Sequence, residues 1–153
     1  MSTTQTKTDI VQTFMNALEA NNREQAASYL SESFIFSGWT PQPLNKQSFL
    51  NVIGGLKAGL PNLTFNLQNV QEQDTIVTGT IQVSGHQTDS FILPELSLPP
   101  IPQMGESVSL PTENVTYAFN EHKQITQWNI QQVPEGDIYG LIRQLGIDVR
   151  PIQ

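Results

Sequence analysis

The chain has 153 residues, of which 37% are hydrophobic and only 14% charged, and its formal net charge at pH 7 is -7. This length predicts one domain over residues 1–153, with residues 1–8 as a flexible N-terminal tail. Seven scattered Lys and Arg stand against fourteen Asp and Glu, so nucleic acid and anionic membranes are not expected as partners. The sequence contains no Cys, which excludes disulfides, thiolate metal sites and a Cys nucleophile.

Targeting and metal-binding signals are also missing from the sequence. No apolar run approaches the roughly 20 residues that span a bilayer. The first residues, MSTTQTKTD, lack the apolar core of a signal peptide, so we expect a cytoplasmic protein. His86 and His122 are far apart, and no His, Asp or Glu cluster has metal-ligand spacing. We therefore expect no metal.

Three helices are predicted in the first 61 residues. Residues 9–20 repeat apolar side chains at three- and four-residue spacing, with Asp9 or Thr8 as the cap. A shorter Ala-rich helix follows from residue 23, and a short strand is expected over 34–37. The third helix is capped by Asn45 and ends at Gly59 and Pro61.

From residue 64 onward the apolar period changes from about four to two, which predicts strands. Residues 64–85 form one hairpin with QEQD (71–74) as its turn, and residues 113–130 form a second hairpin with NEHK (120–123) as its turn. The segment 94–111 between them is too rich in proline for a central strand, so we expect a long ordered loop or a lid. A final helix follows Asp137.

This order of elements predicts an α+β fold in which helices pack on one face of a curved antiparallel sheet. A strongly bent sheet around helices forms a cone, and its open end is a natural pocket for a small molecule.

Four blocks of the sequence resemble, in order, those of the SnoaL-like polyketide cyclases within the nuclear-transport-factor-2-like superfamily. They are SGHQTDSF (84–91), PPIPQMGESVSLP (99–111), FNEHKQITQWNI (119–130) and DIYGLIRQLGI (137–147). The resemblance implies a cone-shaped, cystatin-like fold with a pocket between helices and sheet, frequent dimers through the outer sheet face, and chemistry without a cofactor. Enzymatic members close rings by intramolecular aldol condensation, using an Asp as general acid/base with a nearby His.

The resemblance assigns the acid position in two ways, and both stay open. Counted back from QLG, the acid falls on Asp137; counted forward from Trp128, it falls on Gln132. The His of the neighbouring strand falls near Tyr117 or Ala118, which are not His. The His of the SGTHxGxF pattern falls on Gln87, while His86 lies one residue earlier and therefore on the opposite face of a strand.

Asp137 has two compatible interpretations: an N-cap of the last helix, or a general acid/base whose pKa is raised by partial burial. His86 is the second candidate catalytic residue, although a surface turn is its ordinary environment. Glu95, Glu106 and Glu113 are expected to be solvated. The candidate pocket residues are Phe14, Leu18, Trp39, Tyr117, Trp128 and Gln132.

Three functions follow as hypotheses. The first is a cofactor-independent cyclase, isomerase or dehydratase for a small hydrophobic or polyketide-like substrate, with Asp137 as acid/base and Tyr117, Gln132 or His86 holding a developing enolate. The second is a non-catalytic carrier that keeps the pocket. The third is a homodimeric interaction module whose pocket is filled by side chains or by the proline-rich loop. Whether the pocket is open, and whether it contains an acid, distinguishes them.

Overall fold

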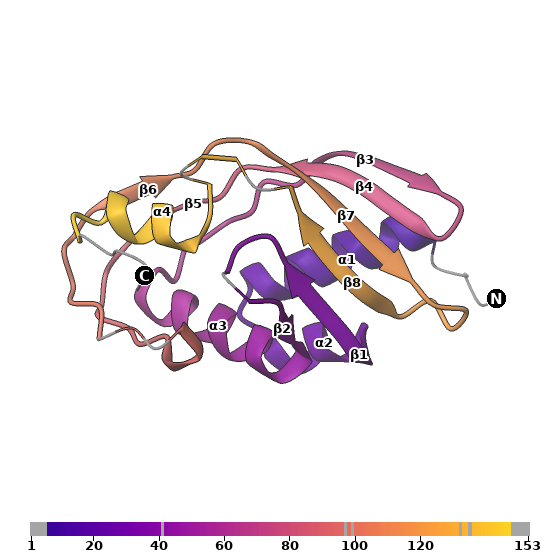
Figure 1. Ribbon diagram of the computed structural model, residues 1–153, viewed down its shortest axis with the longest axis horizontal. Helices are drawn as coiled ribbons and strands as arrows, with labels where there is room; N and C mark the ends of the chain where they lie inside the picture. The colour runs from indigo at the N-terminus through magenta and orange to yellow at the C-terminus, as the bar shows by residue number, and fades with distance from the viewer. Residues whose placement is uncertain are drawn as a thin grey trace.

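The computed structural model describes residues 6–40, 42–96, 98, 100–131, 133–134 and 136–147. Its helices are α1 (Lys7–Glu19), α2 (Arg23–Ser28), α3 (Lys46–Gly59) and α4 (Ile138–Gln144), with a 3-10 turn η1 (Pro94–Leu96). Its strands are β1 (Leu30–Ser37), β2 (Leu44–Asn45), β3 (Gln68–Gln73), β4 (Ile76–Ile81), β5 (Ser84–His86), β6 (Ser107–Ser109), β7 (Glu113–Phe119) and β8 (Ile125–Ile130). Helices and sheet pack as separate layers (Figure 1), so the α+β prediction is confirmed.

The main sheet has the strand order β2-β1-β8-β7-β4-β3. Neighbouring strands are antiparallel except for β1 and β8, which run parallel. The sheet is therefore mixed, where a purely antiparallel one was predicted. Hairpins fix the direction of strands that follow each other in the chain, whereas β1 and β8 are about ninety residues apart and no short turn fixes theirs.

The described residues of the proline-rich segment form mostly loop, but the segment also contains strand β6, which pairs with β5 in a second small sheet. The side chain of Gln87 is fully buried and holds the loop through three hydrogen bonds. Its Nε2 donates to the carbonyls of Asp89 (3.0 Å) and Pro102 (2.8 Å), and its Oε1 accepts from the backbone N of Met104 (2.8 Å). Gln87 thus has a structural role at the position where the resemblance placed a His.

Several element boundaries differ from the sequence prediction. Thr6 caps α1 and forms a capping box with Asp9, so the predicted caps Thr8 and Asp9 were wrong. Residues 6–8 belong to this box and helix, while residues 1–5 lie outside the described residues. The β3–β4 turn lies at 74–75, with Asp74 at φ 51°, so most of QEQD is strand. Asn45 caps α3 as predicted.

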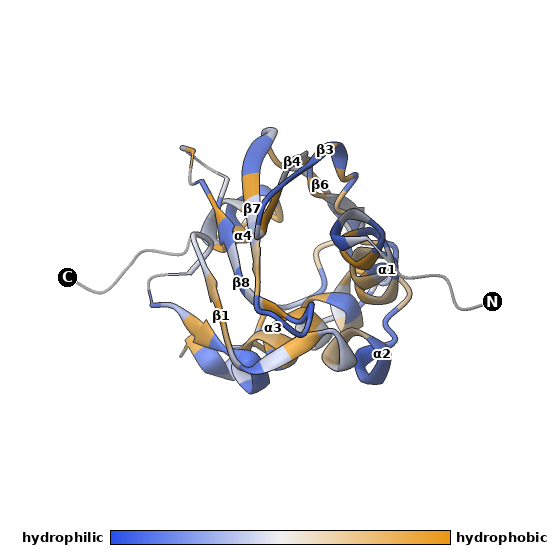
Figure 2. Cartoon of the chain, turned by 90° about the vertical axis from the view of Figure 1, so that its right-hand side faces the viewer, coloured by the Kyte–Doolittle hydropathy of each residue, from blue (hydrophilic) through white to orange (hydrophobic). Residues whose placement is uncertain are grey.

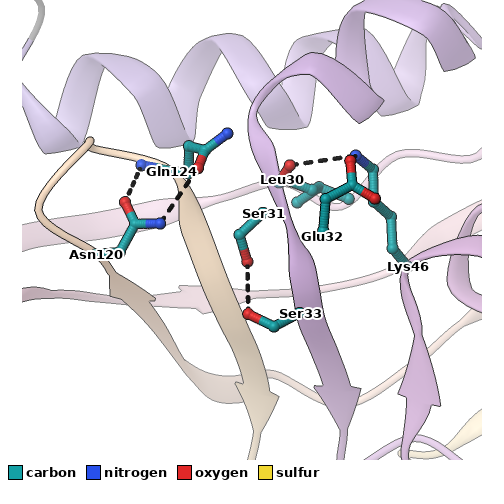
Figure 3. A network of polar contacts seen from close by, with 7 residues as sticks. All are labelled: Leu30, Ser31, Glu32, Ser33, Lys46, Asn120 and Gln124. Carbon is teal, nitrogen blue, oxygen red and sulfur yellow. Dashed lines mark hydrogen bonds and ion pairs between the residues drawn. The ribbon is translucent and has the colours of Figure 1, made fainter.

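Strand β1 begins four residues earlier than predicted, at Leu30. Figure 3 shows the polar contacts around this end of the strand. Lys46 Nζ donates to the Leu30 carbonyl at 3.3 Å and lies 3.4 Å from Glu32 Oε1. These contacts tie the start of α3 to the start of β1, where Leu30 pairs with Ile125 of β8 and the strand continues through the polar residues Ser31 to Ser33.

The interior between helices and sheet is filled by aromatic side chains. In Figure 2, α1 stands opposite the curved sheet, with the interior between them. Trp128 occupies this interior, stacked on Tyr117 with ring centroids 5.4 Å apart and in edge contact with Phe14 and Phe49. All four side chains are fully buried. None of the helices in the described ranges is both long and apolar enough to cross a membrane.

Candidate functional site

Asp137 caps the last helix, as the sequence predicted. Its backbone is extended (φ -93°, ψ -176°), and its side chain accepts a hydrogen bond from the backbone N of Gly140 at 2.9 Å. This bond satisfies one of the amides that a helix start leaves without an intrahelical partner. The side chain is half-buried, so capping leaves it partly open to solvent.

Glu113, the first residue of β7, is buried beside this cap, with only 1% of its surface exposed. The expectation that Glu113 is solvated was wrong. The sequence did hold the signal: Glu113 precedes Val115, Tyr117 and Phe119 at two-residue spacing, and alternate residues of a strand share one face. Extending the apolar alternation by one step places this carboxyl on the inner face of the sheet.

Three segments distant in sequence enclose the Glu113 carboxyl. The indole Nε1 of Trp39, which follows β1, donates to Glu113 Oε1 at 3.2 Å. Gly136 packs directly against the other oxygen, since a Cβ at this position would lie 2.7 Å from Glu113 Oε2. The backbone N of Ile138 donates to the Trp39 carbonyl at 3.2 Å. The start of α4 is therefore fastened over the buried carboxyl.

Burial raises the pKa of the Glu113 carboxyl to about 7. The hydrogen bond from Trp39 and the nearby backbone N–H of Val133 lower the pKa, and the charge of Asp137 raises it. The Val133 amide is close enough to act on this pKa, yet Glu113 Oε2 accepts no hydrogen bond of ordinary geometry from the described residues. Near neutral pH, protonated and ionised Glu113 are therefore both populated.

The phenol of Tyr139 lies close enough to Asp137 for the charge of Asp137 to act on it. Burial, followed by the charge of Asp137, raises the pKa of the Tyr139 hydroxyl, and its side chain is half-buried. We call Trp39, Glu113, Asp137 and Tyr139 the carboxyl cluster. It combines a carboxyl that is partly neutral at pH 7, a half-buried second carboxyl and a neutral phenol, which are groups that can donate and accept protons.

The predicted pocket residues occupy the core. Phe14, Leu18, Trp39, Tyr117 and Trp128 are each at most 3% exposed, and Gln132 lies outside the described residues. Tyr117 Oη donates to Met15 Sδ at 3.3 Å, whereas the buried Trp128 Nε1 donates to no group in the described ranges. These side chains belong to one buried core, and Trp39 is also a member of the carboxyl cluster.

His86 is not joined to the carboxyl cluster by any contact that the structure records among the described residues. It lies exposed on β5, and its Nδ1 is 2.9 Å from Ser107 Oγ on β6. The predicted pairing of His86 with Asp137 is therefore unsupported. No group of three His, Asp or Glu residues in the described ranges could hold a metal ion.

Four hollows lined by described residues lie on the outside of the helices and the sheet. Two of about 700 and 500 Å³ flank α3, one of about 360 Å³ lies on the outer face of the sheet, and a small one lies between α1 and α3. Neither Asp137 nor Trp128 lines any of these four. Among the described residues, the aromatic side chains between helices and sheet are packed on one another and buried.

No family model and no curated protein matches the sequence, but many solved structures share its fold. A SnoaL-like polyketide cyclase from Agrobacterium tumefaciens is 16% identical and superposes with a TM-score of 0.62, covering 83% of this chain and 91% of its own. An LEH-like epoxide hydrolase from M. tuberculosis is 11% identical, with a TM-score of 0.63 and coverage of 92% of both chains. An NTF2-like protein of unknown function from Cytophaga hutchinsonii is 17% identical, with a TM-score of 0.59, covering 88% and 96%.

These matches define the class of the protein by its fold. The chain has the cone-shaped fold of the nuclear-transport-factor-2-like proteins, which SnoaL-like polyketide cyclases share. The recognition made from the sequence blocks is thereby confirmed at the level of fold. Because this fold supports several unrelated activities, function has to be argued from the carboxyl cluster.

Proposed function

We propose that the chain is a cofactor-independent acid/base protein that acts on a small hydrophobic or polyketide-like molecule as a cyclase, isomerase or dehydratase. The observation that carries the proposal is the pair formed by Glu113 and Asp137. A neighbouring carboxyl that can stay protonated near neutral pH leaves Asp137 available as a base without a second negative charge beside it. The pKa of Glu113 is raised to about 7, and Asp137 is one cause of this.

The two carboxyls have different roles because their exposure differs. Asp137 is half-buried and can contact a substrate, so it is the general base that accepts a proton from an acidic C–H or O–H group. Glu113 lies behind it and is a positioning residue. While Glu113 is protonated, it places no second negative charge beside Asp137. The Tyr139 phenol can donate a hydrogen bond to an oxygen on which charge develops. The epoxide hydrolase of the same fold adds epoxide opening to the reactions worth testing.

The outer face of the sheet supports the proposal of a homodimer. The row Ser37, Asn129, Thr116, Thr78 and Gln71 crosses five strands in register and carries no charge. Two chains of net charge -7 can meet on such a face without desolvating an ionised group. Side-chain amides and hydroxyls on the two copies would then hydrogen-bond to each other.

A non-catalytic interaction module, whose pocket is filled by side chains, is the second candidate, and a specific observation favours it. Stacked Tyr117 and Trp128, with Phe14 and Phe49 around them, occupy the space where a ligand of the cone would lie. If this packing persists in solution, no substrate enters the cone and Asp137 serves only as a helix cap. The two candidates therefore differ in whether a small molecule binds.

The first experiment is native mass spectrometry of the protein purified gently from its source cells, followed by denaturing extraction. A small molecule in a defined ratio supports the pocket and supplies the compound to assay. A bare protein that also fails to bind 1-anilinonaphthalene-8-sulfonate supports the interaction module instead.

Asp137→Asn then tests catalysis with the helix cap preserved, because Asn caps helices about as well as Asp. We expect turnover of the extracted compound to fall by about 10²- to 10⁴-fold, the usual contribution of a general base, with little change in the melting temperature. Glu106→Gln, at an exposed acid, is the matched control and should keep full activity. Unchanged turnover in Asp137→Asn would exclude the acid/base role.

A further inference from the structure

A hollow of about 500 Å³ lies on the outer side of α3, between α2 and η1. It shares no lining residue with the carboxyl cluster, and the proposed function gives it no role. Its volume falls in the usual range for small-molecule sites, about 300 to 1,000 Å³. Arg23 lines this hollow and two neighbouring ones, including the larger hollow beside Lys46 and Glu32; Figure 3 shows those last two side chains.

The guanidinium of Arg23 and the carboxylate of Glu95 both line the hollow, and the side-chain amide of Asn51 hydrogen-bonds to each of them. Arg23 Nη2 donates to Asn51 Oδ1, and Asn51 Nδ2 donates to Glu95 Oε2 at 3.0 Å. Gln47 Nε2 also donates to Asn51 Oδ1, at 3.2 Å. Asn51 is therefore bonded on both sides and stands between the guanidinium of Arg23 and the carboxylate of Glu95.

Both charged groups keep bonding capacity for a ligand. A guanidinium group has five N–H donors, and Nη2 makes the hydrogen bond that the structure records for Arg23. Glu95 Oε1 is shielded from water and accepts no hydrogen bond from the described residues, which is costly for a carboxylate oxygen. Glu95 lines the hollow and is only half-buried, so a small rotation of its carboxylate presents this oxygen to a donor.

The glycine pair of α3 and an exposed isoleucine complete the hollow. A Cβ on Gly54 would lie 3.9 Å from Arg23 Nη1, and a Cβ on Gly55 would lie 2.6 Å from the Ile92 carbonyl oxygen. Gly55 therefore lets the 92–95 segment approach the helix closely, whereas Gly54 leaves room beside Arg23. Ile92 is 59% exposed, the most exposed large hydrophobic residue in the described ranges. Together with Pro94, it offers an apolar contact next to the two charges.

We propose that this hollow binds an α-amino acid with an apolar side chain, whose carboxylate pairs with Arg23 and whose ammonium group pairs with Glu95. The spacing fits this ligand class. Two hydrogen bonds through one amide separate the guanidinium and the carboxylate by at most about 8 Å. An α-amino acid with a hydrogen bond of about 2.8 Å at each end bridges a similar distance. Its apolar side chain then covers Ile92.

The experiment titrates L-leucine into the ¹⁵N-labelled full chain and follows the backbone amides of Gly54 and Gly55. We expect saturable shifts of both amides. 4-Methylpentanoate, which lacks the ammonium group, and isoamylamine, which lacks the carboxylate, should each bind at least tenfold more weakly. Arg23→Gln and Glu95→Gln should each weaken leucine binding at least tenfold, while Lys123→Gln, a cation removed from the hairpin turn, should not change it. Thermal unfolding checks that each variant is folded.

Two outcomes would overturn the proposal. If leucine causes no saturable shift, the chain from Arg23 to Glu95 only clamps α2 and η1 onto α3. If 4-methylpentanoate binds as tightly as leucine, the hollow recognises an anion alone and Glu95 has no part in it. Because Asp137 does not enter the titration, failure here leaves the proposed acid/base function untouched.

Discussion

At the scale of single residues, the clearest feature is an acid buried where its charge is poorly solvated. Glu113 receives one indole hydrogen bond through Oε1, and the packed backbone of Gly136 limits access to Oε2. Burial disfavours the ionised form, and the same burial places the midpoint of its titration near neutral pH. One carboxyl therefore links the stability of the start of α4 to pH.

Glu113→Gln should remove this pH dependence. The folded-state pKa of Glu113, about 7, is higher than its value in the unfolded chain, near 4.3. Its protonated form is therefore compatible with folding at low pH. As the pH rises through the window from about 4 to 7, ionisation lowers the free energy of unfolding, and above pH 7 the loss is complete. At about 1.4 kcal/mol per pKa unit, the loss amounts to about 3 to 4 kcal/mol.

Urea unfolding at pH 4 and pH 8 measures the effect. Between these two pH values, the free energy of unfolding of Glu113→Gln should gain about 3 to 4 kcal/mol relative to the original chain. For Glu106→Gln, at an exposed position, the free energy of unfolding should change with pH as it does in the original chain. If the free energy of unfolding of Glu113→Gln also changes with pH as in the original chain, Glu113 is ionised and well solvated in the folded protein.

At the scale of elements, α3 is distinguished by two adjacent glycines with opposite surroundings. Glycine normally weakens a helix. Gly54 faces open space near Arg23, whereas Gly55 contacts the backbone carbonyl of Ile92. The close approach at Gly55 lets the segment before η1 pack on the helix, and this packing encloses one side of the amino-acid hollow.

The two glycines make a matched pair of variants. Gly54→Ala should stabilise the protein by about 0.5 to 1 kcal/mol, because alanine is the better helix former and its Cβ has room. Gly55→Ala should destabilise it by about 1 to 3 kcal/mol, because its Cβ would overlap the Ile92 carbonyl. Thermal and urea unfolding compare the two. Equal effects would mean that the 92–95 segment does not pack on α3 in solution.

At the scale of the whole molecule, charge is distributed unevenly. The chain carries a net charge of -7, yet the registered row across β1, β8, β7, β4 and β3 is uncharged. Thr116 stands in the middle of this row. An acidic protein with one uncharged sheet face has one surface on which self-association brings no like charges together.

Thr116→Glu tests the proposed dimer. At a two-fold interface one substitution places two like charges near each other, so we expect the original chain to be a dimer and the variant a monomer. Light scattering coupled to size-exclusion chromatography measures both masses. Gln103→Glu, in the exposed loop, should leave the dimer intact. A monomeric original chain would exclude the dimer.

The sequence by itself determined the elements and the class of fold. Apolar spacing of three to four residues marked α1 and α3, alternation marked β4 and β7, and Asn45 and Asp137 were recognised as caps, because these signals depend on neighbours along the chain. The ordered blocks then identified the fold. Boundaries were predicted less accurately, since strand β1 begins at Leu30 and the contacts of Lys46 with Leu30 and Glu32 are not local.

Only the tertiary structure decided what these elements bring together. The parallel pairing of β1 with β8 and the packing of the aromatic residues between helices and sheet depend on contacts between distant parts of the chain. The contacts that bring Trp39, Glu113 and the start of α4 together also join distant parts of the chain. The alternation that placed Val115 inside also placed Glu113 there, but its protonation depends on the indole and the second carboxyl beside it. Burial and partners set the pKa of an acid, and both belong to the folded chain.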